Sequence, residues 1–250
     1  MADLTSPAAL SLTDMSKSFV GTKVLDYLSF EVRAGQVVAL LGENGAGKST
    51  LLKIISGILR GDGGEMRIGG QVVDLRTPKA AKQAGIALIH QELQQVPELS
   101  VAQNMFLGNA ITRFAIFKDH AKMRAKAREL LADLDPTIDV RSKIKNLRVA
   151  QRQIVEIAKA LLAKAKVIAM DEPTSSLTPI EFEKLVSVID SLKAQGIAII
   201  YVSHKLNEVF RVASHATILR DGKKVADVDL AKTNEAAVVG LMVGLSLIHI

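Results

Sequence analysis

The chain has 250 residues, enough for one large domain with a stable core, and it contains no cysteine. Disulfide bonds and thiolate chemistry are therefore excluded, and a reducing compartment is favoured. The net charge of +6 comes from scattered lysines and arginines without interleaved aromatic residues, so we expect no nucleic-acid binding, although the charge can help at an anionic membrane surface.

No targeting or membrane-spanning segment is expected. Residues 1–6 lack a basic segment followed by an apolar run, so no signal peptide is visible. The apolar stretch from Ala236 to Ile250 would be about 22 Å long as a helix, which is short of the ~30 Å that a bilayer core requires. We therefore expect that the chain does not span a membrane.

Residues 8–41 are expected to be rich in β-strands. Leu10 and Leu12, and later Phe30 and Val32, alternate with other residues as half-buried strands do. The run from Val37 to Leu41 is continuously apolar, which indicates a buried parallel strand.

The segment after this strand is the motif on which the functional interpretation depends. It fits G-x-x-x-x-G-K-[ST], a loop whose backbone amides wrap the phosphates of a nucleotide. Its glycines allow positive φ angles and close approach to anionic oxygens, and the helix that follows points its positive N-terminus at the same charge. Lys48 is expected to neutralise the terminal phosphates, and the Ser49 hydroxyl to ligate Mg²⁺. The predicted nucleotide-binding residues are Gly42, Glu43, Asn44, Gly45, Ala46, Gly47, Lys48, Ser49 and Thr50.

Downstream of this loop, apolar residues between 51 and 59 recur at helical spacing, so we predict a helix there. A hairpin should turn at Gly69-Gly70, and residues 86–90 predict a short buried strand that ends at Gln91. Residues 92–158 have weak strand signals, so we predict a mainly helical insertion. Its apolar stripe at helical spacing consists of Met123, Ala127, Leu130, Leu131 and Leu134.

Alternation of strands and helices then resumes. The apolar run from Val167 to Met170 leads into Asp171-Glu172, and the run from Ile197 to Val202 leads into Ser203-His204. A helix is expected between the two runs, from about Pro179 to Lys193. Strands that carry polar residues at their C-terminal ends and alternate with helices indicate an open α/β sheet with its ligand at those ends.

A hairpin expected between residues 216 and 228 completes the predicted elements. The fold class is α/β: a P-loop NTPase with a mostly parallel sheet, an N-terminal antiparallel β subdomain and a helical insertion. We expect one domain over residues 1–250. Its α/β core would comprise residues 8–91 and 159–244, and its helical subdomain residues 92–158.

The polar residues at the strand ends suggest the chemistry. Asp171 could hold the Mg²⁺ shared with Ser49, and Glu172 could orient and deprotonate an attacking water. Gln91 could reach the metal or the water, and His204 could hydrogen-bond a γ-phosphate. Plainer roles stay open, since two acids after a strand are often a helix cap or ion-pair partners, Gln91 could simply end a strand, and His204 could be structural. The order along the chain favours catalytic roles for Lys48, Gln91, Glu172 and His204.

These motifs together resemble the ATP-binding subunit of ABC transporters over residues 8 to about 244. More narrowly, the chain resembles the N-terminal half of the tandem ATPases that drive bacterial monosaccharide importers of the ribose, xylose and galactose type. The resemblance rests on the phrases Leu41–Thr50, Ile89–Leu93, Val155–Leu161, Asp171–Ser175 and Leu219–Gly222.

The resemblance implies an ATPase that uses ATP and Mg²⁺, with Ser49, Gln91 and Asp171 at the metal. It also implies that the chain is a peripheral subunit on the cytoplasmic face of the inner membrane. It implies a second ATPase unit, in tandem or as a homodimer, an integral-membrane permease and, indirectly, a periplasmic sugar-binding protein. Phe19 matches the aromatic residue that stacks on adenine, with an ordinary core Phe as the alternative. Residues 91–104 match the region that faces the permease.

One motif departs from the family. ABC proteins usually have Leu-Ser-Gly-Gly-Gln, a signature that caps the γ-phosphate of ATP held by the opposite unit. In this chain Arg148 stands in the place of the signature serine. Losing one preorganised hydrogen-bond donor to the phosphate can cost about 2.7–4 kcal/mol, whereas an arginine that faces the phosphate could add roughly 1.5–3 kcal/mol of stabilisation. The sign of the effect stays open, and we expect an asymmetric pair in which this chain's own phosphate loop is the working site. The corresponding residues here are Leu147, Arg148, Val149, Ala150 and Gln151.

Length is the second departure, because family members of this type usually carry two such halves in one longer chain. Residues 245–250 fit neither an α/β pattern nor the family, so we interpret them as a non-native or truncated tail, with a true single-unit ATPase that homodimerises as the alternative. Two other functions stay open. One is a soluble ABC ATPase that acts on ribosomes or DNA, and the other is a half that binds nucleotide and is inactive without its C-terminal partner.

Overall fold

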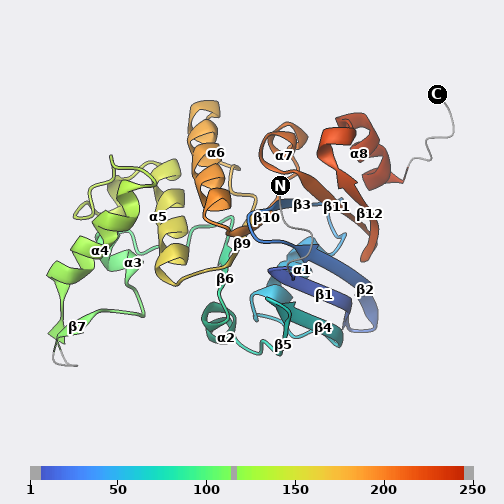
Figure 1. Cartoon of the computed structure of the whole chain (residues 1–250), viewed down its shortest axis with the longest axis horizontal. Helices are drawn as coiled ribbons and strands as arrows, with labels where there is room; N and C mark the ends of the chain where they lie inside the picture. Colours follow the sequence, from blue (N-terminus) through green and yellow to red (C-terminus); the bar gives the residue numbers. More distant parts are fainter. Residues whose placement is uncertain (1–6, 114–116, 245–250) are drawn as a thin grey trace.

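The computed structural model describes residues 7–113 and 117–244, and its centre is a six-stranded sheet (Figure 1). The strands are β3 (Val37–Leu41), β6 (Ile86–Ile89), β9 (Val167–Asp171), β10 (Ala198–Val202), β11 (His215–Arg220) and β12 (Lys223–Asp229). They lie in the order β12-β11-β3-β10-β9-β6. Only the edge strand β12 is antiparallel to its neighbour, so the prediction of a mostly parallel sheet is confirmed.

Both faces of this sheet are covered, which explains why its strands are continuously apolar. Successive side chains of a strand point to opposite faces. Val37, Ala39 and Leu41 therefore join one hydrophobic cluster, while Val38 and Leu40 join the other. The first cluster includes residues of α5 (Val149–Leu162), α6 (Pro179–Ala194), α7 (Leu206–Val212) and α8 (Glu235–Val243), and the second includes α1 (Lys48–Ile55) and α2 (Pro78–Gln83).

The second cluster also contains the inner face of an antiparallel sheet from the N-terminal part of the chain. Its strands are β1 (Leu10–Phe19), β2 (Thr22–Val32), β4 (Gly63–Ile68) and β5 (Gln71–Val73), in the order β2-β1-β4-β5. Leu10 lies opposite Val32, and Leu12 lies opposite Phe30, so the two alternating patterns meet on one buried face. The predicted antiparallel subdomain and the hairpin at Gly69-Gly70 are confirmed.

The insertion is mainly helical, with α3 (Val101–Met105), α4 (His120–Ala132), the 3₁₀ turn η1 (Ile144–Asn146) and α5. In its predicted stripe, Met123, Ala127 and Leu131 are buried, and Leu130 and Leu134 pack against the same cluster. A short hairpin of β7 (Thr112–Arg113) and β8 (Phe117–Lys118) was not expected. The expected limit of the insertion between residues 158 and 159 falls inside α5, so this helix continues past it.

The helix predicted up to residue 59 is wrong in its length. Helix α1 ends at Ile55, and Ile58 is 44% exposed. Gly57 turns the chain with a φ of 70°, and a Cβ there would lie 2.5 Å from Thr77 O, so only glycine fits in the turn that follows the helix. The predicted helix near 179–193 and the hairpin near 216–228 are present as α6 and β11–β12.

Residues 245–250, for which a non-native or truncated tail is expected, lie outside the described residues. Among the helices within 7–113 and 117–244, none is both long enough and apolar enough to cross a bilayer.

Candidate active site

The predicted phosphate loop, Gly42–Thr50, connects the C-terminal end of β3 to α1. All three of its glycines have a positive φ, 149° at Gly42, 87° at Gly45 and 103° at Gly47. A Cβ on Gly42 would lie 2.3 Å from Leu219 O, and one on Gly47 would lie 2.7 Å from Leu25 Cδ2. Glycine is therefore required at both positions, and the loop is held closely against β2 and β11.

Lys48 lies among the carbonyls of this loop. Its Nζ donates to Gly42 O at 2.7 Å and to Glu43 O at 2.9 Å. Burial lowers the pKa of Lys48, while the negative charges of Glu172 and Asp171 act in the opposite direction. The ammonium group is thus within electrostatic reach of both predicted carboxylates.

Asp171 and Glu172 lie at the C-terminal end of β9 and differ in backbone conformation. Asp171 pairs with Val202 of β10, and burial together with the charge of Glu172 raises the pKa of Asp171. Glu172 has a φ of 46°, and its N–H donates to Val202 O at 2.9 Å. A left-handed φ at a residue other than glycine is uncommon and concentrates at functional sites.

Two predicted residues, Gln91 and His204, contact the carboxylate of Glu172. Gln91 Nε2 donates to Glu172 Oε2 at 3.4 Å, and His204 Nδ1 lies 3.1 Å from Glu172 Oε1. Gln91 follows β6, Glu172 follows β9 and His204 follows β10, so parallel strands bring them to one edge of the sheet. Both oxygens of the Glu172 carboxylate therefore have a partner, which fixes the orientation of the group.

We expect Asp171→Asn to stabilise the nucleotide-free chain. A carboxyl group whose pKa is raised on folding destabilises the fold above that pKa, and this penalty is lost as the pH falls and the group is protonated. At neutral pH the variant should therefore have a higher Tm than the unaltered chain.

Thermal unfolding at neutral and at acidic pH measures this effect, and the difference between the two proteins should shrink at acidic pH. Asp190→Asn is the matched control, because Asp190 is exposed in a surface ion pair with Lys193. A lower Tm for Asp171→Asn at neutral pH would contradict the expectation.

Phe19 ends β1, and its side chain is 41% exposed, so it does not belong to the hydrophobic core. Lys17 Nζ lies 5.4 Å from the centroid of its ring. An exposed ring at the end of a strand is available for contact with a flat ligand.

The segment Leu147–Gln151 enters helix α5, with Arg148 at the N-cap position and its N–H donating to Gln151 Oε1 at 3.2 Å. Arg148 lines a pocket of about 350 Å³ with Glu181 at the start of α6. Hydrogen bonds from Thr178 and the charge of Arg148 lower the pKa of Glu181. In the part of the chain that the structure describes, the lining of this pocket contains no residue of the phosphate loop.

A buried polar cluster behind the site was not predicted. Glu208 of α7 is 6% exposed, accepts a hydrogen bond from Thr174 Oγ1 and pairs with Lys205 Nζ at 3.0 Å. Tyr201 OH donates to the same carboxylate at 3.4 Å, and burial and the charge of Glu208 raise the pKa of Tyr201. Lys205 Nζ also donates to Thr174 O at 3.1 Å, so the cluster joins the segments that follow Glu172 and His204.

Across the described ranges, no three His, Cys, Asp or Glu side chains gather where they could hold a metal ion. A metal at this site would therefore depend on the single carboxylate of Asp171, on the hydroxyl or amide oxygens of Ser49 and Gln91, and on oxygens from a ligand. This donor set is typical of Mg²⁺ in nucleotide sites.

Comparison with known proteins gives a consistent result. The family model described as ABC transporter matches residues 25–175. The chain is 46% identical over 236 residues to the ribose import ATP-binding protein RbsA of Chromobacterium violaceum, covering 94% of this chain and 47% of that protein. It is 45% identical over 242 residues to the galactose/methyl galactoside import ATP-binding protein MglA of Haemophilus influenzae, covering 97% and 48%.

Among solved structures, the crystal structure of an ATP-binding cassette of an ABC transporter in its ADP conformation superposes with a TM-score of 0.83. It is 26% identical, and the match covers 96% of this chain and 100% of that chain. The chain spans about half the length of the curated relatives that it matches.

Proposed function

The chain belongs to the ABC transporter family, and from this premise we propose that it binds and hydrolyses ATP to power the import of a monosaccharide through a membrane permease. The observation that carries the proposal is the convergence of Gln91 and His204 on Glu172, within electrostatic reach of Lys48 in the phosphate loop. The names of the relatives, which specify ribose and galactose or methyl galactoside import, support the substrate class.

The reaction that this geometry favours is in-line attack of a water molecule on the γ-phosphorus of ATP. Glu172 takes a proton from the water as the new P–O bond forms, and the bond between the γ-phosphorus and the bridging oxygen of ADP breaks. Gln91 and His204 orient the carboxylate, and Lys48 stabilises the charge that develops on the phosphates.

Ser49 and Asp171, with Gln91 beside them, are the residues that would hold Mg²⁺. Their oxygens suit this ion, which commonly binds one or two carboxylates together with substrate phosphates. Asp171 is half-buried at the C-terminal end of β9, and a cation bound there would favour the charged form of its carboxyl group. When bound, the ion supplies charge neutralisation at the phosphates.

The base of the nucleotide would stack on Phe19. The exposure of this ring supports the assignment.

A second ATPase unit, in tandem or as another copy, would complete each nucleotide site with its own signature surface. In this chain that surface is Leu147–Gln151. Arg148 shares its pocket with Glu181 of the same chain, so a carboxylate lies near the place where a phosphate held by the partner would bind.

The permease would dock on an apolar groove of about 390 Å³ between α2, the end of β6 and α5. Ile58 and Leu107, which line it, are 44% and 52% exposed. Leu93 and Gln94 also line it, so the segment after Gln91 reaches both the active site and this groove. The proposal places the chain on the cytoplasmic face of the membrane as a peripheral subunit, and a periplasmic binding protein would deliver the sugar.

The test is a comparison of ATP hydrolysis by this chain alone, with its C-terminal counterpart, and with the permease in proteoliposomes that contain labelled ribose or galactose. Hydrolysis should require the second unit and be stimulated by the permease, and labelled sugar should move across the bilayer. A rate of hydrolysis that does not change when the permease is added would favour a soluble ABC ATPase. Nucleotide binding without hydrolysis in every mixture would favour a half that only binds nucleotide.

A further inference from the structure

A second groove, of about 790 Å³, adjoins the groove that we assign to the permease. The two share Lys82, Lys159 and Ala163, so they form one continuous surface. Within the described residues, no Asp or Glu lines the second groove. We call it the lysine groove, because its lining includes Lys79, Lys82, Lys126, Lys159, Lys164 and Lys166.

Only part of this charge is neutralised. Lys126 pairs with Glu129 at 2.6 Å, and Lys159 pairs with Glu156 at 2.9 Å. The other four lysines are exposed, and no described carboxylate forms an ion pair with them: Lys79, Lys82, Lys164 and Lys166. A net positive charge is therefore exposed to solvent over a small area. The mutual repulsion of these lysines is unfavourable unless an anion binds there.

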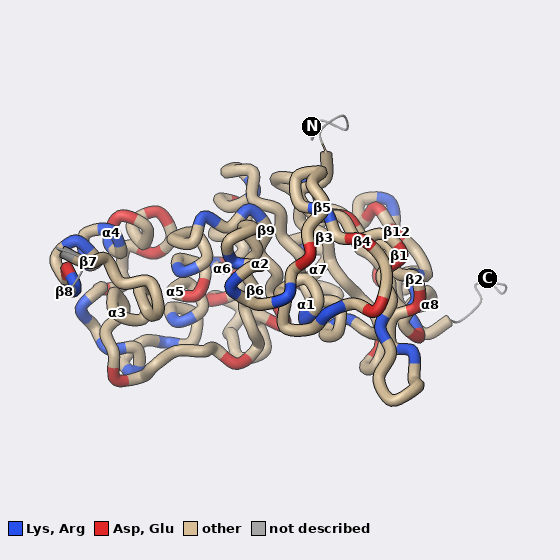
Figure 2. The backbone as a smooth tube through the Cα atoms, turned by 90° about the horizontal axis from the view of Figure 1, so that it is seen from below, with Lys and Arg blue, Asp and Glu red and all other residues tan. Residues whose placement is uncertain are grey.

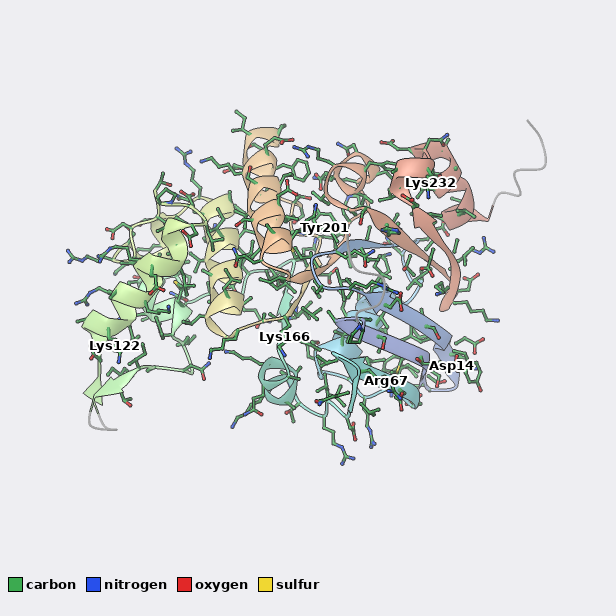
Figure 3. All side chains as sticks on the ribbon, viewed as in Figure 1. Asp14, Arg67, Lys122, Lys166, Tyr201 and Lys232 are labelled. Carbon is green, nitrogen blue, oxygen red and sulfur yellow. The ribbon has the colours of Figure 1, made fainter. Side chains whose placement is uncertain are left out.

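Two of these lysines are held in defined positions. Lys164 follows α5 with a left-handed φ of 58°, where glycine or asparagine is usual, and its N–H donates to Leu161 O at 2.8 Å. Lys166 is fixed by its N–H to Gly85 O at 2.7 Å, and Figure 3 shows it between α5 and α2. The dipole of α5 favours a cation at Lys164, but it gives no reason for the lysines contributed by α2 and α4.

The floor of the lysine groove is apolar. Met105 and Phe106 are buried in it, and Ile111, Leu162 and Ala163 are half-buried. A basic rim over an apolar floor is typical of surfaces that lie against lipid headgroups. Figure 2 shows Lys and Arg segments around α2, β6 and α5 on the face viewed from below.

We propose that the lysine groove binds the headgroups of anionic lipids in the bilayer that surrounds the permease. Continuity with the permease groove would bring it to the membrane surface, and to that extent the proposal rests on the proposed function. Charge complementarity identifies the ligand as anionic, and among the described residues of the lining the one aromatic, Phe106, is 4% exposed and so offers no platform for bases. The headgroups would hold the subunit beside the permease between catalytic cycles.

The experiment measures co-sedimentation of the 250-residue chain with vesicles of equimolar phosphatidylglycerol and phosphatidylcholine, and with vesicles of phosphatidylcholine only. The test variant is Lys79→Gln/Lys164→Gln/Lys166→Gln. The control Lys223→Gln/Lys224→Gln/Lys232→Gln removes the same charge from β12 and the 3₁₀ turn η2 (Leu230–Lys232), far from the groove. Each lysine near an anionic surface should contribute about fivefold to the binding constant, so the test variant should bind about a hundredfold more weakly.

The proposal requires binding to the anionic vesicles that falls with salt, is lost in the test variant and is retained in the control. Equal loss in both variants would show that only net charge matters and would overturn the assignment to this groove. Equal binding to both kinds of vesicle would also overturn it. So would a chain that binds an RNA duplex but no vesicles, if the test variant loses the RNA binding. Because no permease or ATP is present, failure here leaves the transport test above unaffected, and the reverse also holds.

Discussion

Replacing Glu172 with Gln is expected to lower ATP turnover by about 10²–10⁴-fold, the usual contribution of a positioned general base. The amide cannot accept the proton of the attacking water, but it keeps the size of the side chain. Phosphate-loop contacts do not involve Glu172 directly, so ATP binding should be retained. Turnover and nucleotide affinity should both be measured in the presence of the proposed second ATPase unit.

Glu183→Gln is the matched control, because Glu183 is exposed on α6 and pairs with Arg211 at the surface. Arg148→Ser gives an independent arm. It restores the usual signature serine and is expected to alter the partner's site rather than this chain's own. If both Arg148→Ser and Glu172→Gln left turnover intact, the asymmetric pair would be wrong.

Glu208→Ala should destabilise the chain by about 3–5 kcal/mol, the cost of removing one partner from a buried ion pair. It leaves Lys205 without its carboxylate, and the hydroxyls of Thr174 and Tyr201 lose their acceptor. Urea unfolding measures the change. Turnover should also fall, since the cluster anchors the segments that follow Glu172 and His204.

Glu183→Ala provides the comparison for stability as well. Its ion pair is exposed, so its loss should cost no more than about 1 kcal/mol. A cost for Glu208→Ala as small as that of Glu183→Ala would show that the buried cluster contributes little to the fold.

The sequence was sufficient to predict the phosphate loop and the polar residues at the strand ends. Both follow from local patterns, since the glycines of the loop and the apolar runs before Asp171 and His204 stand in short contiguous segments. Parallel pairing then brings the strand ends to one edge, as expected. The direct contacts of Gln91 and His204 with Glu172 were not predicted, because the sequence analysis expected these two side chains at a metal, a water or a γ-phosphate.

The buried cluster of Glu208 could not be predicted in the same way. Glu208 lies in the first turn of α7. From sequence alone, an acidic residue at such a position is ordinarily interpreted as a favourable charge near a helix N-terminus. The partner of Glu208, Thr174, is 34 residues earlier, and the pairing depends on how the turn after β9 lies against α7. Short elements were missed for a related reason: α2 and α3 are each shorter than two full turns, and tertiary contacts stabilise them more than periodicity does.

The contact between His204 and Glu172 limits how many groups the imidazole can serve. An ionised carboxylate only accepts, so the proton of this hydrogen bond is on Nδ1, and a neutral ring then presents Nε2 as an acceptor. A phosphate oxygen also only accepts, so a neutral His204 cannot bind Glu172 and a γ-phosphate at once. Either the ring becomes an imidazolium or it releases Oε1 of Glu172.

If the ring releases Oε1, this oxygen becomes free to accept the proton of the water, and it becomes free only when phosphate is bound. The protonation of His204, followed by NMR with and without an ATP analogue, distinguishes the two cases. The hydrogen-bonding capacity of one ring would then decide whether Glu172 stays tethered to His204, which links the freedom of this carboxylate to the presence of phosphate.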